Sequence, residues 1–254
     1  GDLQVFAGFL KLCAGRTAQE INMSAIGSDS GVSHNTVRAW MSVLEAGYLI
    51  HRLPAWHLNI RKQVVKARKL HFFDTGLACY LLGIQAPDQL RFHPLRVAVF
   101  ESWVVSEIYK AIVHSGMQPD LFHYRETRGT EIDLLIDRGK DLDAVEIKSG
   151  ATTATDFFKN LELFQGRMKD SGKKLRIRSH VVYGGDNTHR RSRAQVLSRR
   201  DAQRLAKSFQ RAARDNQQEK KPEESGNFMT VPPPKYRLYK VPATAGWTKA
   251  HALR

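Results

Sequence analysis

The chain has 254 residues, an ordinary apolar content and a formal net charge of +15, which allows one or two domains with a sizeable core. No apolar run approaches the roughly 18 residues of a membrane-spanning helix, and the first residues lack the basic segment of a secretory signal. Cys13 and Cys79 lie in apolar helical contexts, which favours two buried thiols in a reducing compartment and a cytoplasmic location. The chain starts with Gly1 instead of Met, so we expect a piece of a longer protein or an incompletely predicted gene.

The positive charge is concentrated near the C-terminus. Residues 190–254 hold 16 Lys/Arg and 5 Asp/Glu, whereas residues 1–189 hold 24 and 20. Residues 192–215 could form a basic helix, but a polar stretch and three consecutive prolines follow. We therefore expect 188–254 to be a basic, largely disordered tail. Such a tail would attract nucleic acid non-specifically, although a solvated appendage is the plainer interpretation.

The first 50 residues predict a helix-turn-helix. A short amphipathic helix is expected over residues 3–14 and a second from about Thr17. After a turn at 27–31, Ser33 is placed to cap a further helix that ends at Gly47. The start of that helix carries a polar face that could contact DNA, formed by His34, Asn35, Thr36 and Arg38.

Two predicted strands complete this first part. They cover 48–52 and 69–73, and the basic segment between them includes Arg61 and Lys62. This order is that of a winged helix, in which a recognition helix and a basic wing contact duplex DNA. The same module can serve only for packing against other protein, so the pattern leaves both interpretations open.

The second part predicts alternating helices and strands. A capped helix from Asp74 and a connector over 85–94 lead to a long helix from about Leu95 to His114. Strands follow at 121–125, 131–136 and 142–148, then a helix over 155–164 and a strand over 177–183. The expected order is α-β-β-β-α-β, with the two domains at 1–84 and 95–187.

Three charged side chains stand out in the predicted hairpin RGTEIDLLIDRGKDLDAVEIKSG. Asp133 lies inside an apolar strand, and Glu146 and Lys148 flank Ile147, so that strand alternation puts both on one face. Charges in mostly buried strands are costly unless they pair with each other or with a metal. This cost indicates a functional site.

A divalent metal fits these residue types. Cleavage of a phosphodiester needs an activated water and a countercharge, and a hard ion such as Mg²⁺ or Mn²⁺ with oxygen ligands supplies both. Asp133 and Glu146 would be the metal ligands, with the carbonyl of Ile147 as a possible third. Lys148 would orient the water and stabilise charge, and Arg125 and Arg128 could hold phosphates.

The order of elements, with Asp133 on one strand and Glu146-Ile147-Lys148 on the next, resembles the PD-(D/E)xK nuclease superfamily. The resemblance implies a restriction-endonuclease-like domain and a carboxylate on the first helix, for which Glu101 is best placed and Glu107 stands behind it. The implied catalytic set is Asp133, Glu146, Lys148 and Glu101, with Glu131 an outer participant. The alternative is a strand-end ion pair, either Glu146 with Lys148 or Asp133 with Arg128.

Over residues 5–187 the sequence also resembles the C-terminal region of bacterial and archaeal AAA-class ATPases. That region is a winged helix followed by a nuclease-like domain of unknown function. The stretches that carry the resemblance are 32–50, 69–77, 100–107 and 129–150. It implies an N-terminal ATPase domain, yet this sequence has no G-x-x-x-x-G-K-[ST] motif, so no ATP site is expected in this chain.

The sequence therefore predicts an α/β protein with a winged helix, a nuclease-like domain and a basic tail. We expect a DNA-binding, Mg²⁺- or Mn²⁺-dependent nuclease-like region that has no membrane segment and can form a homo-oligomer. The first alternative is a catalytically idle module of such an ATPase that binds DNA or a partner. A truncated gene product without an independent role is the second.

Overall fold

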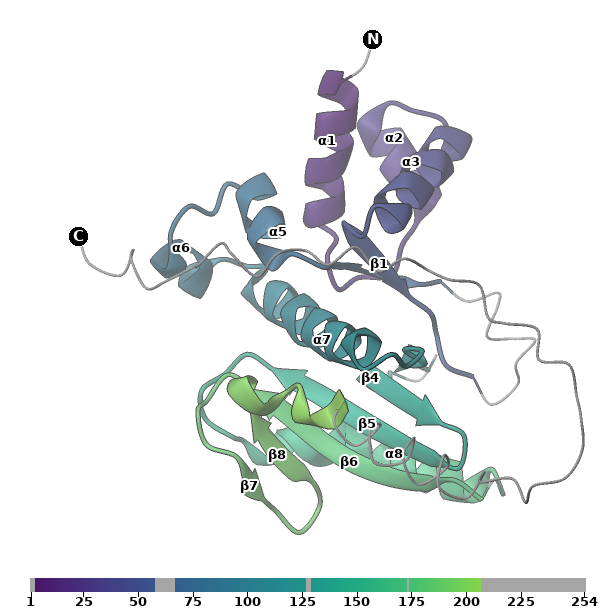
Figure 1. Cartoon of the computed structure of the whole chain (residues 1–254), viewed down its shortest axis with the longest axis vertical. Coiled ribbons are helices and arrows are strands. Elements are labelled where there is room, and N and C mark those ends of the chain that lie inside the picture. Colours follow the sequence, from purple (N-terminus) through teal and green to yellow (C-terminus); the bar gives the residue numbers. More distant parts are fainter. Residues whose placement is uncertain (1–2, 58–66, 127–128, 173, 207–254) are drawn as a thin grey trace, which may run out of the picture.

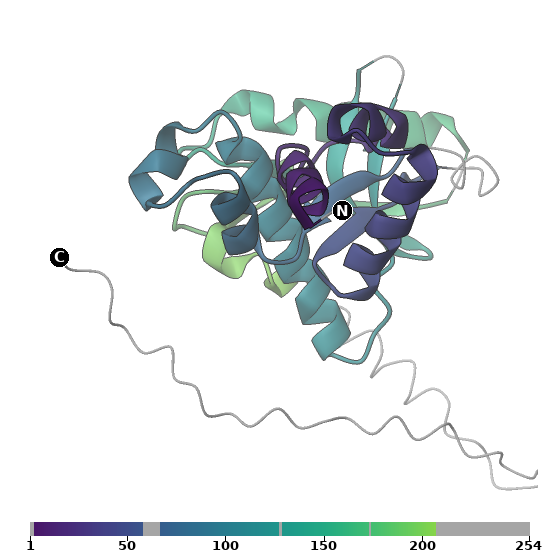
Figure 2. The same cartoon turned by 90° about the horizontal axis from the view of Figure 1, so that it is seen from above.

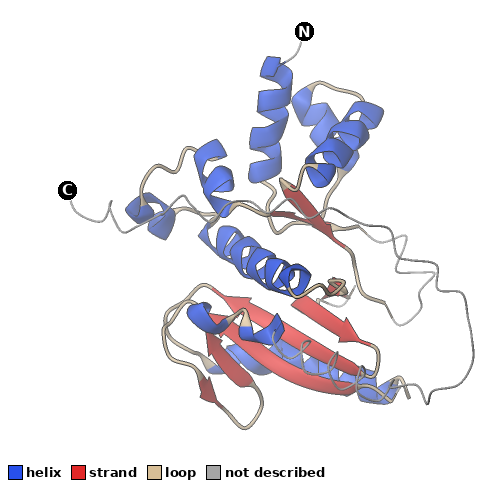
Figure 3. Cartoon of the chain, in the orientation of Figure 1, coloured by secondary structure: helices blue, strands red, loops and turns tan. Residues whose placement is uncertain are grey.

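The computed structural model describes residues 3–57, 67–126, 129–172 and 174–206. The protein is a mixed α/β structure with a helical N-terminal part, a two-stranded sheet and a six-stranded mixed sheet (Figure 1, Figure 3). Within the described ranges, no helix is both long enough and apolar enough to cross a membrane. The predicted contacts Arg61, Lys62 and Arg128 lie outside these ranges, as does 207–254.

The N-terminal part packs helices against a short antiparallel sheet. Its elements are α1 (Leu3–Ala14), α2 (Met23–Ser30), α3 (His34–Ala46), β1 (Ile50–Leu53), β2 (Lys69–Phe72) and α5 (Thr75–Leu81). The hydroxyl of Ser33 accepts the Thr36 N–H at 3.1 Å, which confirms the predicted cap of α3. The helix expected from about Thr17 begins only at Met23, because the chain first makes a turn that buries Thr17.

The second part follows the predicted order of helices and strands. Its elements are α6 (Pro87–Phe92), α7 (Arg96–His114), β3 (Leu121–Arg125), β4 (Glu131–Arg138), β5 (Asp141–Lys148), the 3-10 helix η1 (Thr155–Phe158), α8 (Lys159–Asp170) and β6 (Arg176–Tyr183). Strands β3, β4 and β5 are antiparallel, whereas β6 runs parallel to β5. Helix α7 covers one face of the sheet and α8 the other, each closing an apolar core.

The sheet continues beyond the predicted end at residue 187. Strands β7 (His189–Arg190) and β8 (Gln195–Ser198) extend it, and η2 (Arg199–Asp201) follows. Val196 and Leu197 of β8 are fully or almost fully buried in the two cores. The expectation of a tail from 188 was therefore wrong for 188–206, because these apolar residues complete the sheet beside β6 instead of forming a basic helix.

The two parts of the chain share helix α7. Figure 1 shows α7 between the N-terminal helices and the sheet, and Figure 2, seen from above, has the N-terminal helices in front. The hydroxyl of Ser102 on α7 lies 2.7 Å from the Thr17 hydroxyl and 3.0 Å from Nδ1 of His71. After β1 the chain also runs along β3, where the Trp56 N–H donates to the His123 carbonyl at 2.6 Å. The N-terminal part is thus fixed against the helix that carries Glu101.

Candidate metal and nucleic-acid site

The site begins where β4 and β5 stop pairing. Their ladder runs from Arg138↔Asp141 to Leu134↔Val145, although both strands continue further. On the other side of β4, the register with β3 shifts between Phe122 and Tyr124. At this irregularity Oδ2 of Asp133 accepts the Ile147 N–H at 2.7 Å. The Asp133 carboxylate thus accepts a main-chain hydrogen bond from β5 just beyond the end of the ladder. Such a re-aimed side chain is typical of β-bulges.

Glu146 is the most deeply buried of the predicted catalytic acids, with 2% of its surface exposed. Its Oε2 lies 2.5 Å from Nζ of Lys148, whereas Oε1 is buried and has no hydrogen-bond partner among the described residues. Burial, reinforced by the charge of Asp133, raises the pKa of Glu146 to about 7, although Lys148 and the nearby Asn160 oppose the shift. This carboxylate lacks full compensation.

Lys148 keeps its charge beside these acids. Partial burial alone would lower its pKa, but the carboxylates of Glu146 and Asp133 outweigh burial and raise it. The shared face that strand alternation predicts for Glu146 and Lys148 is confirmed by their ion pair. The pair is also the structural alternative that the sequence left open for this position.

A second lysine, Lys69 of β2, reaches into the cluster from the N-terminal part. Its Nζ lies 3.0 Å from Oε1 of Glu101 and 2.7 Å from Oε1 of Glu131, and 3% of the residue is exposed. Burial and the charge of Asp133 raise the pKa of Glu101 to about 8, against the effect of Lys69. Burial would also raise the pKa of Glu131, but the pairing with Lys69 lowers it.

Negative charge exceeds positive charge in this cluster. The four carboxylates of Glu101, Glu131, Asp133 and Glu146 face the two ammonium groups of Lys69 and Lys148. Burial raises the pKa of Asp133 too, although Lys69, Lys148 and the Ile147 N–H oppose it. A further cation would relieve this imbalance, since each raised pKa records a cost of holding the ionised form.

The carboxylates of Asp133 and Glu146 fit a hard divalent ion that takes only a few of its ligands from the protein. Among the described residues, no three His, Cys, Asp or Glu side chains are grouped so that they could hold a metal by themselves. Mg²⁺ commonly binds through one or two carboxylates plus water and substrate phosphate. Asp133 and Glu146 supply two carboxylates, and the buried, unpartnered Oε1 of Glu146 is an available oxygen ligand.

Of the remaining predicted residues, those on α3 and Glu107 lie away from this cluster, whereas Arg125 borders it. His34, Asn35 and Arg38 are exposed at the start of α3, whereas the Thr36 hydroxyl hydrogen-bonds to Ser33 at 2.9 Å. Glu107 faces the C-terminal end of the described chain and accepts from the Gln203 amide at 2.6 Å. Arg125 is exposed on β3, where it stands opposite Glu131 of β4 and helps to lower the pKa of that carboxyl, and its Nη1 lies 3.9 Å from Oε1 of Glu20.

Sequence reasoning missed Lys69 and placed Glu131 too far outside the site. A lysine at the start of a strand ordinarily points to solvent, and the contact with Glu101 crosses 32 residues of chain. All four residues of β2 are buried, but this burial is visible only in the folded structure.

Comparison with known proteins finds two family matches along the chain. Residues 1–88 match a domain of unknown function, DUF8612, and residues 97–221 match another, DUF4143, which typically occurs in AAA-ATPase-associated proteins. Uncharacterised proteins of Mycobacterium bovis and Mycobacterium tuberculosis are each 26% identical over 121 residues, or 48% of this chain. The match spans only 26% of the length of these curated relatives.

Proposed function

We propose that the chain is the DNA-binding, nuclease-like region of an AAA-class ATPase, with a metal-dependent phosphodiester hydrolase centre of the PD-(D/E)xK type. The centre comprises Asp133, Glu146 and Lys148, with Glu101 beside them. The observation that carries the proposal is the buried, under-compensated carboxylate of Glu146, with its pKa raised to about 7, next to a charged lysine. Perturbed acids grouped with a lysine are typical of catalytic sites.

The arrangement of the sheet supports the same proposal. The order α7-β3-β4-β5-α8-β6 is the one expected of a restriction-endonuclease-like domain, and the site lies where β4 and β5 part. The order α2-α3-β1-β2 is that expected of a winged helix, with exposed polar residues at the start of α3. DNA contact by His34, Asn35 and Arg38 is part of the proposal.

Each residue has a defined task in the proposed reaction. Asp133, Glu146 and the Ile147 carbonyl would hold Mg²⁺ or Mn²⁺, and the bound ion would activate water and neutralise charge on the phosphate. The Lys148 ammonium, fixed by Glu146, orients the attacking water and stabilises the developing negative charge. Glu101 holds Lys69 in place, which keeps the N-terminal part against the site.

A second candidate function is a catalytically idle module that binds DNA or a partner. The ion pairs Lys69–Glu101 and Lys148–Glu146 favour it, because they already compensate part of the carboxylate charge that a metal would otherwise neutralise. An idle module would bind DNA with a steep salt dependence and no metal dependence. Since neither matched domain carries an assigned function, this choice depends on an assay.

The test is cleavage of supercoiled and branched DNA by the purified chain with Mg²⁺ or Mn²⁺. We expect nicking by the wild type and a loss of about 10²-fold or more in Lys148→Ala, because charge stabilisation in the transition state is removed. Lys140→Ala is the matched control, since Lys140 is exposed in the turn at the other end of the same hairpin. Equal nicking by both variants, or none by the wild type, would refute the nuclease.

A further inference from the structure

A pocket lies at the carboxyl ends of the parallel strands β5, β6 and β8. Ser149, Gly184 and Arg199 follow these three strands directly and line the pocket, together with residues of α5, α6 and α7. Its volume is about 420 Å³, within the range of small-molecule sites. Ligands of open α/β sheets characteristically bind at the carboxyl ends of parallel strands.

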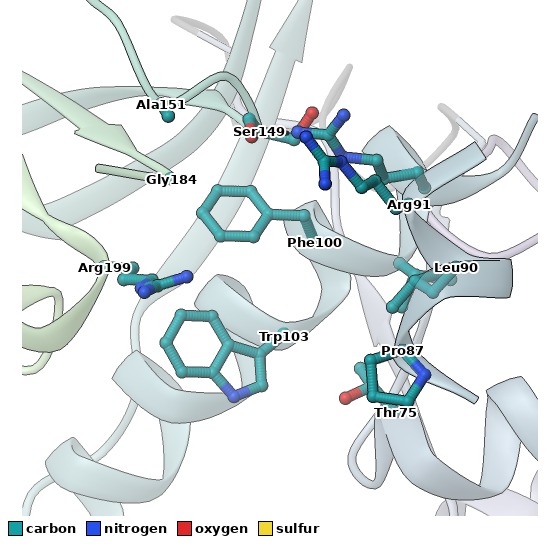
Figure 4. A pocket seen from close by; sticks show the side chains of 12 residues that line it. Thr75, Pro87, Leu90, Arg91, Phe100, Trp103, Ser149, Ala151, Gly184 and Arg199 are labelled. Carbon is teal, nitrogen blue, oxygen red and sulfur yellow. Dashed lines mark hydrogen bonds between the residues drawn. The ribbon is translucent and has the colours of Figure 1, made fainter. Parts of the chain in front are cut away.

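Two aromatic rings form the centre of the pocket. Phe100 and Trp103 of α7 have ring centroids 5.8 Å apart and ring planes inclined by 32°. Figure 4 shows both rings in the middle of the pocket, with Arg199 on one side of them and Arg91 and Leu90 on the other. Both residues are only partly buried, so ring surface is available to a planar ligand.

Three arginines surround the rings. Arg91 and Arg199 are exposed, and Arg96 donates from Nη2 to the Ser149 carbonyl at 2.7 Å. Asp186, outside the lining, accepts from Arg199 at 3.1 Å. The described lining residues include no Asp or Glu, so Arg91 and Arg96 give the pocket a positive potential suited to phosphate.

The pocket adjoins the proposed nuclease centre. Phe100 directly precedes Glu101 on α7, and Ser149 directly follows Lys148 at the end of β5. Gly184 keeps this junction tight, because a Cβ there would lie 2.5 Å from the Ser149 carbonyl oxygen. A nucleic-acid strand cut at the centre would therefore pass directly by the aromatic rings.

We propose that this pocket binds one unstacked nucleotide of the strand being cut, with its base against Trp103 and Phe100 and its phosphate at Arg91 and Arg96. The choice of a nucleic-acid ligand rests on the proposed function. Aromatic stacking combined with arginine is the chemistry by which proteins hold single-stranded nucleotides. A base within a duplex is already stacked, so the pocket selects single-stranded or branched DNA over intact duplex.

The test is binding of the full chain, in EDTA, to a fluorescent oligothymidylate and to a duplex of the same length. We expect tighter binding of the single strand. Trp103→Ala weakens it roughly tenfold or more, because base stacking is lost, and Arg91→Ala lowers the salt slope by about 1. Arg176→Ala is the matched control, because Arg176 is an exposed arginine at the opposite end of β6.

The outcomes separate the pocket from the nuclease. Retention of single-strand binding in Lys148→Ala, with sensitivity to Trp103→Ala, supports the pocket even if no DNA is cleaved. Equal affinity for duplex and single strand, or variants at Trp103 and Arg91 that match the Arg176 control, overturns it even if DNA is cleaved. Arg91 is exposed, so its variant gives a result should Trp103→Ala fail to fold.

Discussion

Each half of strand β5 carries a buried carboxylate, and the two carboxylates are in opposite electrostatic situations. Asp143 and Glu146 are both 2% exposed. Asp143 accepts from Arg138 at 2.5 Å, from Arg178 at 2.7 Å and from Nε2 of His180 at 3.1 Å. Glu146 has the single ion pair with Lys148 and leaves Oε1 without a partner among the described residues.

The charged and hydrogen-bonding partners of the two carboxylates, and not their burial, decide the direction of each pKa shift. Burial alone would raise the pKa of Asp143, but His180 and the two arginines outweigh it and hold the pKa below its usual value. At Glu146 the same burial prevails and raises the pKa to about 7. Full pairing of a buried charge is typical of structural ion pairs, whereas under-compensated buried acids are typical of functional sites.

Removing Asp143 should have the largest effect on stability. Asp143→Ala leaves Arg138 and Arg178 without their buried carboxylate, and we expect the free energy of unfolding to fall by about 3–5 kcal/mol. Urea unfolding followed by circular dichroism measures it. A loss below about 1 kcal/mol would contradict the view that this half of β5 is held together by its charges.

Removing Lys69 should lower the free energy of unfolding by less than removing Asp143. Lys69→Met leaves the buried Glu101 and the half-buried Glu131 without their ammonium partner beside Asp133, but Glu101, with its pKa already raised to about 8, can stay protonated. We expect a loss of about 1–3 kcal/mol, measured in the same way, with the exposed Lys11→Met on α1 as the control. A change equal to that of Lys11→Met would show that Lys69 does not fix the N-terminal part to α7.

Glu146 should also make the free energy of unfolding depend on pH. The folded pKa of Glu146 is about 7, above its ordinary value of 4.5, so the folded state binds the proton more tightly than the unfolded chain. The contribution of Glu146 is therefore full below its ordinary pKa and is lost as pH rises towards about 7, by up to about 1.4 kcal/mol per pH unit. Glu146→Gln should flatten this fall.

The stability that Asp143 contributes should change with pH in the opposite direction. Its lowered pKa contributes stability above its ordinary value of 3.8, and that contribution is lost as pH falls through the folded pKa. Asp143→Asn should therefore flatten the acid side of the stability profile and leave the fall near neutral pH. Two variants with the same pH profile would show that the two halves of β5 do not differ as proposed.

Much of the fold followed from local patterns. The Ser33 cap, the order of strands and the shared face of Glu146 and Lys148 depend on residues close in sequence. The prediction failed at 188–206, where the charge of the segment concealed the two apolar residues Val196 and Leu197 that join the sheet. Their burial depends on β6 lying alongside, which no local pattern reveals.

The sequence by itself determined which charges stand in apolar strands and therefore where to look for chemistry. Only the tertiary structure decided which of those charges are compensated, because the partners of Glu101 and Asp143 come from β2 and from β4 and β6 respectively. The pocket beside the site is likewise assembled from segments between Thr75 and Arg199. Whether a buried charge is paired, and whether a pocket is enclosed, depends on which segments lie close together in space, and this is set by the packing of the fold.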